Sequence, residues 1–398
     1  MILANRRILL GVTGGVAAYK AAELLRRLQD LGASVDVVMT EAATRFVGTA
    51  TFQALSGRPV FADAWDTRIA NGMAHIELGR AADLILIVPC SADFMAKLAH
   101  GHADDLLSTL CVARNRPLAI APAMNREMWA NPATQRNVSI LRGDGLHFIG
   151  PASGDQACGE TGEGRMSEPD DIAEAVIALF TEPQLAGRRV LLTAGPTYEP
   201  IDPVRGITNR SSGKMGFAIA RACAHAGAEV ELVAGPCGLP TPAGVVRHDV
   251  ITARDMHAVV LARCDSWQPH VFIGVAAVAD WRIANPADHK LKKDDAGSVP
   301  ELRFAPNPDI LAEVAARPRA PYCVGFAAES ENLLEHGQAK RARKGVPLLV
   351  ANIGPDTFGR DENELLLIDA QGSLSLPRAS KAELAAELVG EIARRLPG

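Results

Sequence analysis

The sequence predicts an α/β protein built from two tandem doubly wound domains, because the same opening pattern occurs twice. At residues 6–10, two arginines and a short apolar run lead into a glycine-rich turn, a helical segment and a second largely apolar run at 32–39. Residues 188–192 begin the same order again, with the second apolar run at 227–233. Buried strand, glycine turn, helix and buried strand are the parts from which parallel sheets are assembled. The length of 398 residues also favours two domains over one.

Further continuous apolar runs support parallel sheets in both halves. They lie at 84–88 and 118–120 in the first half, and at 271–275 and 348–350 in the second. In such Rossmann-like domains, ligands bind beyond the carboxyl ends of the strands. The boundary is expected near 181–187, which separates a first domain at 1–182 from a second at 188–398.

A final helix is predicted to close the second domain. Ser380-Lys381-Ala382-Glu383 has the pattern of a capping box, in which serine and glutamate satisfy the first backbone N–H groups of a helix. An apolar stripe with a spacing of four residues follows, so this helix is expected to pack on the second sheet. The stripe consists of Leu384, Leu388, Ile392 and Leu396.

The composition predicts a soluble, cytoplasmic protein of a reducing compartment. A net charge of −5 argues against a dedicated nucleic-acid binder. The seven cysteines are odd in number and contain no C-x-x-C pair, so neither a disulfide framework nor a structural zinc site is indicated. No signal peptide is recognised, and no apolar run approaches the ~20 residues that span a bilayer.

The glycine turn of the first half favours a mononucleotide. Gly11, Gly14 and Gly15 lack the spacing of the dinucleotide fingerprint. Thr40 follows the second strand, where a dinucleotide site requires an acidic residue for the ribose, and Ser91 follows the strand at 84–88. Hydroxyl groups suit a phosphate or a polar ring edge, which favours FMN over NAD. The alternative is a turn typical of the fold that binds no ligand.

Three residues of the first half are candidates for chemistry. Cys158 lies in a polar, glycine-dense loop beside Arg165, where a thiol is placed to react, unless the cysteine is incidental to a surface loop. Asn125 follows the strand at 118–120 and can donate to a carboxylate, the alternative being a helix cap. His75 precedes a buried strand, and a lone histidine is more often structural than catalytic.

Together, these residues make the first half resemble the homo-oligomeric flavin-containing cysteine decarboxylases. The matching features are His75, P-A-M-N-x-x-M-W at 122–129 and A-C-G-x-x-G-x-G-R-M at 157–166. The resemblance implies FMN, a peptidyl or pantothenoyl cysteine substrate and a trimer with sites between subunits. It also implies that His75 is the base or orients the substrate thiol, that Asn125 holds the substrate carboxylate and that Cys158 is the acid. Asp104 departs from the pattern, in which an amide is expected.

The second half is predicted to bind a nucleoside triphosphate with Mg²⁺. The loop at 206–216 is not a P-loop, because Met215 rather than a hydroxyl residue follows Lys214, but it can cradle phosphate before a helix expected at Phe217. Asp280 ends a buried strand, where a carboxylate can hold Mg²⁺ together with phosphates. Three lysines follow and can neutralise a triphosphate, unless they are only a solvated charge run. They are Lys290, Lys292 and Lys293.

Residues 188–395 resemble phosphopantothenate–cysteine ligases, and the tandem order resembles that of the bacterial bifunctional coenzyme A biosynthesis proteins. The matching motifs are A-G-P-T at 194–197, D-P-V-R at 202–205, T-N-R-S-S-G-K-M-G at 208–216, A-A-V-A-D at 276–280, K-L-K-K at 290–293, N-P-D-I at 307–310 and G-F-A-A-E at 325–329. The resemblance implies activation of 4′-phosphopantothenate by CTP, attack by cysteine, and a dimeric ligase half, so that dimers and trimers together form a dodecamer.

The ligase resemblance also assigns roles to residues. It implies that Lys290 stabilises charge at the α-phosphate, that Asp280 binds Mg²⁺ and that Asn209 holds the acyl intermediate. Phe326 and the turn at 307–310 are expected to frame the base, with Lys340 and Lys344 near the triphosphate. That turn consists of Asn307, Pro308, Asp309 and Ile310.

Two other classes of function fit the sequence less well. A nicotinamide- or flavin-dependent reductase fused to a Rossmann partner requires an acidic ribose ligand, and Thr40 disfavours it. A non-catalytic, flavin-binding regulatory subunit is disfavoured because His75, Asn125 and Cys158 are present together.

Overall fold

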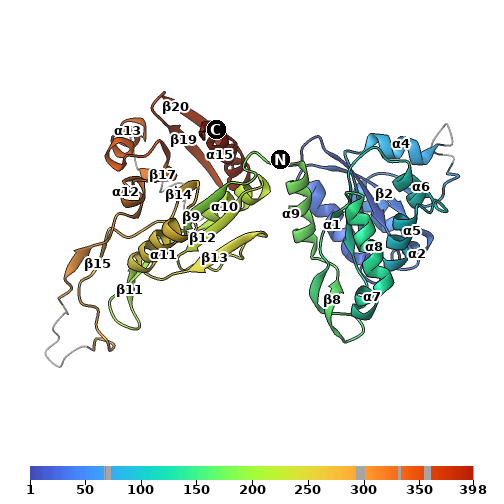
Figure 1. The fold of residues 1–398 in the computed structure, drawn as a ribbon, viewed down its shortest axis with the longest axis horizontal. Helices are drawn as coiled ribbons and strands as arrows, with labels where there is room; N and C mark the ends of the chain where they lie inside the picture. Colours follow the sequence, from blue (N-terminus) through green and yellow to red (C-terminus); the bar gives the residue numbers. More distant parts are fainter. Residues whose placement is uncertain (67, 69–72, 293–300, 330–332, 354–359, 398) are drawn as a thin grey trace. The chain divides into compact units, whose positions relative to one another are not determined.

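The computed structural model describes residues 1–397 except 67, 69–72, 293–300, 330–332 and 354–359 (Figure 1). Of the candidate residues, only Lys293 lies outside the described residues. The chain forms two compact units, Met1–Leu179 and Phe180–Gly398. None of the helices in the described residues combines the length and apolarity needed to cross a membrane.

The first unit contains a six-stranded parallel sheet in the order β3-β2-β1-β4-β5-β6. A separate antiparallel hairpin, β7–β8, follows it. The sheet strands are β1 (Arg7–Val12), β2 (Ser34–Met39), β3 (Val60–Phe61), β4 (Leu84–Cys90), β5 (Leu118–Pro122) and β6 (His147–Phe148), and the hairpin strands are β7 (Ala152–Asp155) and β8 (Thr161–Arg165).

Helices cover both faces of this sheet. Leu9 of β1 points into a core shared with α4, α5, α6 and α8, whereas Ile8 and Leu10 point to the opposite face and are also fully buried. Helix α1 packs on β1, β2 and β4. The helices of this unit are α1 (Ala18–Asp30), α2 (Glu41–Thr44), α3 (Thr49–Ser56), α4 (Ala74–Ala81), α5 (Ala92–His100), α6 (Leu106–Val112), α7 (Arg126–Ala130), α8 (Pro132–Gly143) and α9 (Pro169–Phe180).

The second unit contains an eight-stranded sheet in the order β13-β12-β9-β14-β17-β18-β19-β20. The pairings are parallel up to β18, and β19 and β20 are antiparallel additions at one edge. Its strands are β9 (Arg189–Ala194), β12 (Glu229–Ala234), β13 (Val245–Asp249), β14 (Val271–Gly274), β17 (Tyr322–Glu329), β18 (Leu348–Ile353), β19 (Glu362–Ile368) and β20 (Ser373–Ser380), and two ribbons pair β10 (Tyr198–Pro200) with β11 (Gly206–Thr208) and β15 (Trp281–Ile283) with β16 (Phe304–Pro306).

Alternate residues of β9 are buried on opposite faces of the second sheet. Val190 and Leu192 share a core with α10 and α15, and Leu191 packs with α11 and α12 on the other side. The helices are α10 (Lys214–His225), α11 (Ala253–Ser266), α12 (Ile310–Ala315), α13 (Leu333–Lys344) and α15 (Lys381–Arg395). The predicted fold, two doubly wound α/β domains, is therefore confirmed.

The end of the chain agrees with its predicted structure. Ser380 caps α15 and forms the complete capping box with Glu383. Leu384, Leu388 and Ile392 are buried in the core on the second sheet. Two details differ: α10 begins at Lys214 rather than at Phe217, and β19 and β20 were not predicted.

Candidate active sites

The carboxyl ends of β1 and β4 are joined through Thr13, a buried residue that no sequence pattern had indicated. Its hydroxyl donates to the Pro89 carbonyl at 2.7 Å and accepts from the Ser91 amide at 3.0 Å. The glycine turn and Ser91 are thereby held at the same edge of the first sheet.

The three glycines at this edge have different surroundings. At Gly11, inside β1, a Cβ would lie 2.5 Å from Ile87 Cδ1, and at Gly14 it would lie 2.6 Å from Ala42 Cβ, so close packing accounts for both. At Gly15 a Cβ would meet nothing within 4 Å. Gly15 precedes α1, whose first N–H groups receive no side-chain cap. An uncapped helix start beside an open glycine turn fits the phosphate of a mononucleotide.

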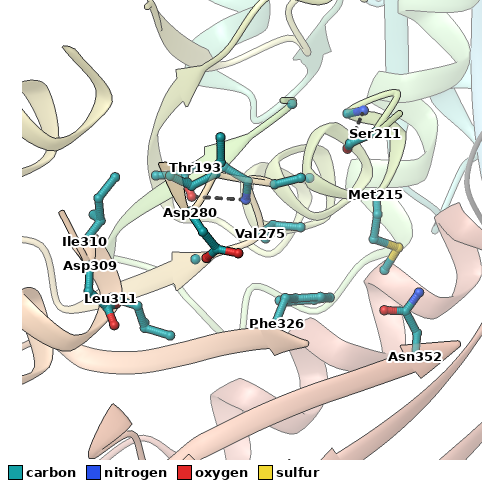
Figure 2. A pocket seen from close by; sticks show the side chains of 18 of the residues that line it. Thr193, Ser211, Met215, Val275, Asp280, Asp309, Ile310, Leu311, Phe326 and Asn352 are labelled. Atoms are coloured by element: carbon teal, nitrogen blue, oxygen red, sulfur yellow. Dashed lines mark hydrogen bonds between the residues drawn. The ribbon is translucent and has the colours of Figure 1, made fainter. Parts of the chain in front are cut away.

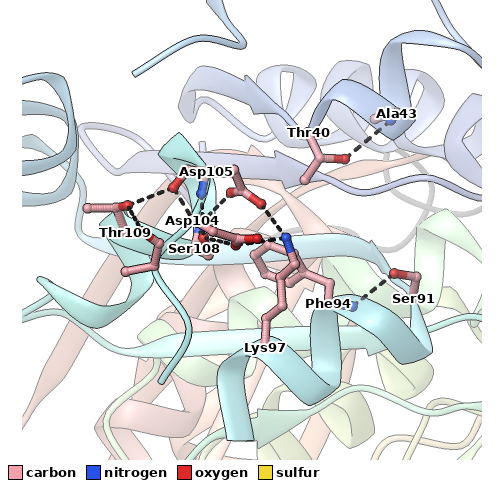
Figure 3. Close-up of polar contacts among 10 residues, drawn as sticks. Thr40, Ala43, Ser91, Phe94, Lys97, Asp104, Asp105, Ser108 and Thr109 are labelled. Carbon is pink, nitrogen blue, oxygen red and sulfur yellow. Dashed lines mark hydrogen bonds and ion pairs between the residues drawn. The ribbon is translucent and has the colours of Figure 1, made fainter. Parts of the chain in front are cut away.

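Thr40 and Ser91 both cap helices at this edge (Figure 3). The Thr40 hydroxyl accepts from Ala43 N at the start of α2, and the Ser91 hydroxyl accepts from Phe94 N at the start of α5, both at 3.2 Å. Each hydroxyl therefore already has a structural role.

Asp104 belongs to an ion-pair network between α5 and α6 (Figure 3). Lys97 Nζ lies 2.8 Å from Asp104 and 3.0 Å from Asp105, and Asp105 forms a capping box with Ser108 at the start of α6. The hydrogen bond from Lys97 lowers the pKa of Asp104, although desolvation opposes the shift. The carboxylate that replaces the expected amide thus has a cationic partner in its own chain.

Asn125 and Cys158 come together although 33 residues separate them. Asn125 caps α7 directly after β5, and its Oδ1 accepts from Glu127 N at 2.8 Å. Its Nδ2 lies 3.5 Å from Cys158 Sγ and 2.5 Å from Glu160 Oε2. Cys158 is exposed, and Cys237 is half-buried, whereas the other five cysteines are buried.

Backbone contacts dock the β7–β8 hairpin against the turn that carries Asn125. Met124 N donates to Gly164 O at 2.9 Å. Gly164 has a φ of 115°, and a Cβ there would lie only 2.6 Å from Met124 O. A glycine is therefore required at this crossing. Arg126 N adds a hydrogen bond of 3.0 Å to Gln156 Oε1.

His75 lies in the first turn of α4 and is half-buried. Within the described part of the chain, no hydrogen bond or ion pair joins it to Asn125 or Cys158. One chain therefore brings together two of the three predicted catalytic residues of this unit, and the role of His75 stays a prediction.

The second unit contains a cleft of about 630 Å³ at the carboxyl ends of its central strands. The residues that line it include Asp280 after β14, Phe326 in β17 and Asn352 in β18 (Figure 2). Asp309 and Ile310, at the start of α12, also line it. Eight residues predicted to bind the nucleotide or Mg²⁺ line this cleft. They are Asp280, Asn307, Pro308, Asp309, Ile310, Phe326, Lys340 and Lys344.

The cleft is positively charged. Five cationic side chains line it in the described residues, against the two carboxylates of Asp280 and Asp309. The cations are Lys214, Lys340, Arg343, Lys344 and Lys381. Such an excess of positive charge suits a polyphosphate.

Two ionisable groups of the cleft have shifted pKa values. Burial opposes ionisation of Asp309, but its ion pair with Lys344 lowers the pKa of the carboxyl group below its ordinary value. Burial and the nearby Lys214 lower the pKa of Lys381, which is 8% exposed and donates to the Arg360 carbonyl at 2.6 Å.

Asn209 and Lys290 do not belong to the described lining of the cleft. Asn209 nevertheless donates to the carbonyl of Ala277, which is a lining residue. Lys290 is exposed, and its neighbour Leu291 is anchored by the D-P-V-R motif: Leu291 N donates to Asp202 at 3.2 Å and Arg205 donates to Leu291 O at 2.8 Å. Arg205 and backbone N–H groups hold the pKa of the buried Asp202 well below its ordinary value, against desolvation.

Several lining residues were not selected from the sequence. Asn352 lies next to the last residue of β18, and the rule that ligands bind at carboxyl ends of strands could have identified it. Lys214 lies inside the motif at 208–216, and Arg343 directly precedes Lys344 in the sequence. Asn363 and Lys381 come from β19 and α15, and no sequence signal places these elements at the cleft.

The residues of the cleft are compatible with Mg²⁺ as an ion shared with substrate phosphates. Among the described residues, no group of three or more histidine, cysteine, aspartate or glutamate side chains could hold a metal. Mg²⁺ commonly uses one or two carboxylates together with phosphate oxygens, and Asp280 in a cationic cleft is compatible with that mode.

Comparison with known families defines the class of protein. Residues 2–181 match the family model described as Flavoprotein, and residues 185–396 match that of the DNA/pantothenate metabolism flavoprotein C-terminal domain. The two sites thus lie in a flavoprotein domain followed by a pantothenate-metabolism domain.

Relatives resemble the chain over almost its full length. The chain is 48% identical over 401 residues to the coenzyme A biosynthesis bifunctional protein CoaBC of Escherichia coli K12. The alignment covers 99% of this chain and 98% of that relative. Identity to CoaBC of Vibrio cholerae serotype O1 is 47% over 391 residues, covering 97% and 98%. A crystal structure of the CoaBC C-terminal domain covers 54% of this chain and 98% of its own, with 35% identity and a TM-score of 0.46.

The chain belongs to the CoaBC family of bifunctional coenzyme A biosynthesis proteins. It is an enzyme that combines a decarboxylase with a ligase.

Proposed function

We propose that the second unit joins cysteine to 4′-phosphopantothenate at the expense of CTP, and that the first unit decarboxylates the product to 4′-phosphopantetheine. The first reaction forms an acyl-cytidylate and releases pyrophosphate, and the amine of cysteine then displaces CMP. The second reaction removes the carboxylate of the cysteine moiety as CO₂.

The cationic cleft supports the ligase reaction. Lys340, Lys344 and Asp280 lie in one cavity with Phe326, which offers an aromatic face to a base. Asp280 would hold Mg²⁺ on the phosphates. Asn209, bonded to a lining carbonyl, would hold the acyl intermediate, and Lys290 would reach the α-phosphate from the segment that Asp202 and Arg205 anchor.

The convergence of Asn125 and Cys158 is the observation that carries the decarboxylase reaction. The Asn125 amide would hold the substrate carboxylate, and Cys158 Sγ would donate a proton to carbon after CO₂ has left. His75 would orient the substrate thiol or accept its proton.

FMN is the cofactor that we propose for the first unit. The turn at Gly14 and Gly15, the uncapped start of α1, Thr40 and Ser91 would hold it, with Gly11 supporting the turn. When bound, FMN supplies the two-electron oxidation of the substrate thiol that creates an electron sink β to the carboxylate, and it reverses this oxidation at the end.

The functional boundaries that we propose are 1–182 for the decarboxylase and 188–398 for the ligase. We further propose a trimeric first domain with sites between subunits and a dimeric second domain, which together give a dodecamer. We also propose a cytoplasmic location, which the unpaired cysteines support.

A nucleotide-dependence assay tests the proposal. Purified protein is incubated with 4′-phosphopantothenate, cysteine and either CTP or ATP, and CO₂ and nucleoside monophosphate are measured. We expect CMP and CO₂ with CTP, and visible flavin absorption in the purified protein. Efficient turnover with ATP in place of CTP would contradict the nucleotide assignment.

A further inference from the structure

The β7–β8 hairpin places a carboxylate of the chain itself between the two residues assigned to the substrate. Glu160 Oε2 lies 2.5 Å from Asn125 Nδ2 and 3.6 Å from Cys158 Sγ, and it accepts a hydrogen bond from each. Both donors are those that the proposed decarboxylase reaction directs at substrate atoms. One glutamate oxygen thus engages the amide and the thiol at the same time.

The surrounding contacts hold this arrangement in place. Asn125 Oδ1 is bonded to Glu127 N at 2.8 Å, so the amide is oriented with its NH₂ group toward Glu160. The hairpin turn is closed by hydrogen bonds from Gln156 N to Glu160 O at 2.7 Å and from Gly159 N to Gln156 O at 2.9 Å. Arg126 Nε lies 3.9 Å from Glu160 and 2.6 Å from Glu127, which leaves a cation beside the carboxylate position.

We propose that Glu160 is a positioning residue whose carboxylate occupies the place of the substrate carboxylate and must exchange with it. The proposal rests on the proposed role of Asn125. Substrate binding transfers the Asn125 amide from Glu160 to the substrate carboxylate and releases the Cys158 thiol toward the substrate. Loss of CO₂ removes the competing carboxylate, so Glu160 returns to Asn125.

Competition between Glu160 and the substrate for Asn125 weakens the apparent binding of ligands that carry the cysteine carboxylate. If Asn125 is free of Glu160 in about a tenth of the molecules, the apparent affinity for a ligand that needs Asn125 falls about tenfold. A ligand without that carboxylate does not need the amide and is not affected. The effect of Glu160 therefore depends on the ligand's carboxylate, which separates it from a general effect on folding.

The test compares two ligands on the full-length flavin-containing protein, in wild type, Glu160→Ala and Glu160→Gln. One ligand is the substrate, phosphorylated pantothenoylcysteine, for which KM is measured. The other is the decarboxylated product, for which the inhibition constant is measured. We expect Glu160→Ala to lower the substrate KM about tenfold, with kcat and the inhibition constant near wild type. Glu160→Gln, which keeps an acceptor but loses the charge, should lower the substrate KM less.

A matched control removes another acid from the same hairpin. Glu163 accepts from Trp129 Nε1 at 3.2 Å, so Glu163→Ala should leave the ratio of the two constants unchanged. An unchanged or raised KM in Glu160→Ala, equal changes in both constants, or a fall in kcat larger than the fall in KM would overturn the proposal. If Glu160→Ala loses flavin, Glu160→Gln decides by the same criteria.

The failure of this proposal is distinguishable from failure of the decarboxylase assignment. Asn125→Ala should abolish CO₂ release if Asn125 holds the substrate carboxylate. If Asn125→Ala loses activity but the Glu160 variants do not change the substrate KM selectively, the exchange is ruled out and the proposed function is still supported.

Discussion

At the scale of single residues, Cys158 differs from the buried cysteines in its exposure and in its neighbours. Burial raises the pKa of Cys223 and of Cys323 to about 12, and such thiols serve as apolar packing groups. Cys158 instead lies on an exposed hairpin within reach of Asn125. Its surroundings, rather than its residue type, distinguish it as the candidate acid.

Cys158→Ser should separate loss of CO₂ from formation of the final product. A hydroxyl is a much weaker acid than a thiol, so protonation of the carbon should stall after CO₂ has left. CO₂ release and 4′-phosphopantetheine are measured in one reaction, with flavin absorption as the control for folding. Undiminished formation of 4′-phosphopantetheine would show that Cys158 is only a hairpin residue.

Lys290→Gln and Asn209→Asp should stop the ligase at different steps. Loss of the Lys290 charge should slow acyl-cytidylate formation by about 10²-fold or more, because negative charge develops at the α-phosphate. Asn209→Asp should still release pyrophosphate but hinder delivery of the cysteine amine, so that acyl-cytidylate accumulates.

Pyrophosphate release and the acyl-cytidylate are quantified for both variants, and flavin content should be the same in both. Arrest of the two variants at one step would show that the division of roles between Lys290 and Asn209 is wrong.

At the scale of elements, the first site depends on how closely the β7–β8 hairpin approaches the loop after β5. The crossing of Gly164 and Met124 allows no side chain, and it carries Cys158 and Glu160 to Asn125. The backbone at Gly164 therefore contributes directly to the geometry of the site.

Gly164→Ala and Gly159→Ala form a matched pair for this element. Both glycines have positive φ, which costs alanine about 1–2 kcal/mol, but a Cβ at Gly159 meets nothing within 4 Å. Gly164→Ala adds a clash with a carbonyl, so it should undock the hairpin and remove most decarboxylase activity while ligase activity remains. Decarboxylation assays of both variants check this, and equal losses would contradict a specific role of the crossing.

The central elements were predictable because buried parallel strands are continuous apolar runs. That signal identified β1, β4, β9 and β14, with the turns that follow them. The antiparallel strands β19 and β20 were missed, because an edge addition has no counterpart in the repeated strand–helix pattern. The two-residue strands β3 and β6 are too short to carry any periodicity.

Site residues could be predicted where they follow a strand of the repeated pattern, but not where they come from elements outside that pattern. The carboxyl edge of the sheet, which collects ligands, indicated both Asn125 and Asp280. The prediction that Asp280 ends a buried strand was wrong in detail, because β14 ends at Gly274 and Asp280 lies in the segment between β14 and β15. Lys381 and Asn363 reach the cleft only because the chain returns to the sheet after β18. The contact of Glu160 with Asn125 depends on the register of the hairpin, which the sequence does not specify.

At the scale of the whole molecule, each unit has its own sheet, its own core and its own site. One core cluster of the first unit runs from Leu9 to Leu146, and Ile8 and Leu10 are buried on the opposite face of the same sheet. The two core clusters of the second unit begin at Leu185 and Leu191. Because each of these clusters draws its residues from one unit, the halves are expected to fold as separate domains.

A fragment of residues 1–180 should therefore fold, bind flavin and decarboxylate supplied 4′-phospho-N-pantothenoylcysteine at a rate close to that of the full chain. Its absorption spectrum and CO₂ release are measured beside those of the full-length protein. A colourless or insoluble fragment would mean that the second unit is required to complete the flavin site.

The most direct test of the proposed two-step reaction follows the carboxyl carbon of cysteine. The full-length protein is given 4′-phosphopantothenate, CTP, Mg²⁺ and cysteine labelled in its carboxyl group, and pyrophosphate and labelled CO₂ are followed together. We predict that pyrophosphate appears first, that labelled CO₂ follows after a lag, and that the two reach equal amounts only when 4′-phosphopantothenate is present. Labelled CO₂ released without 4′-phosphopantothenate or CTP would contradict the two-step reaction.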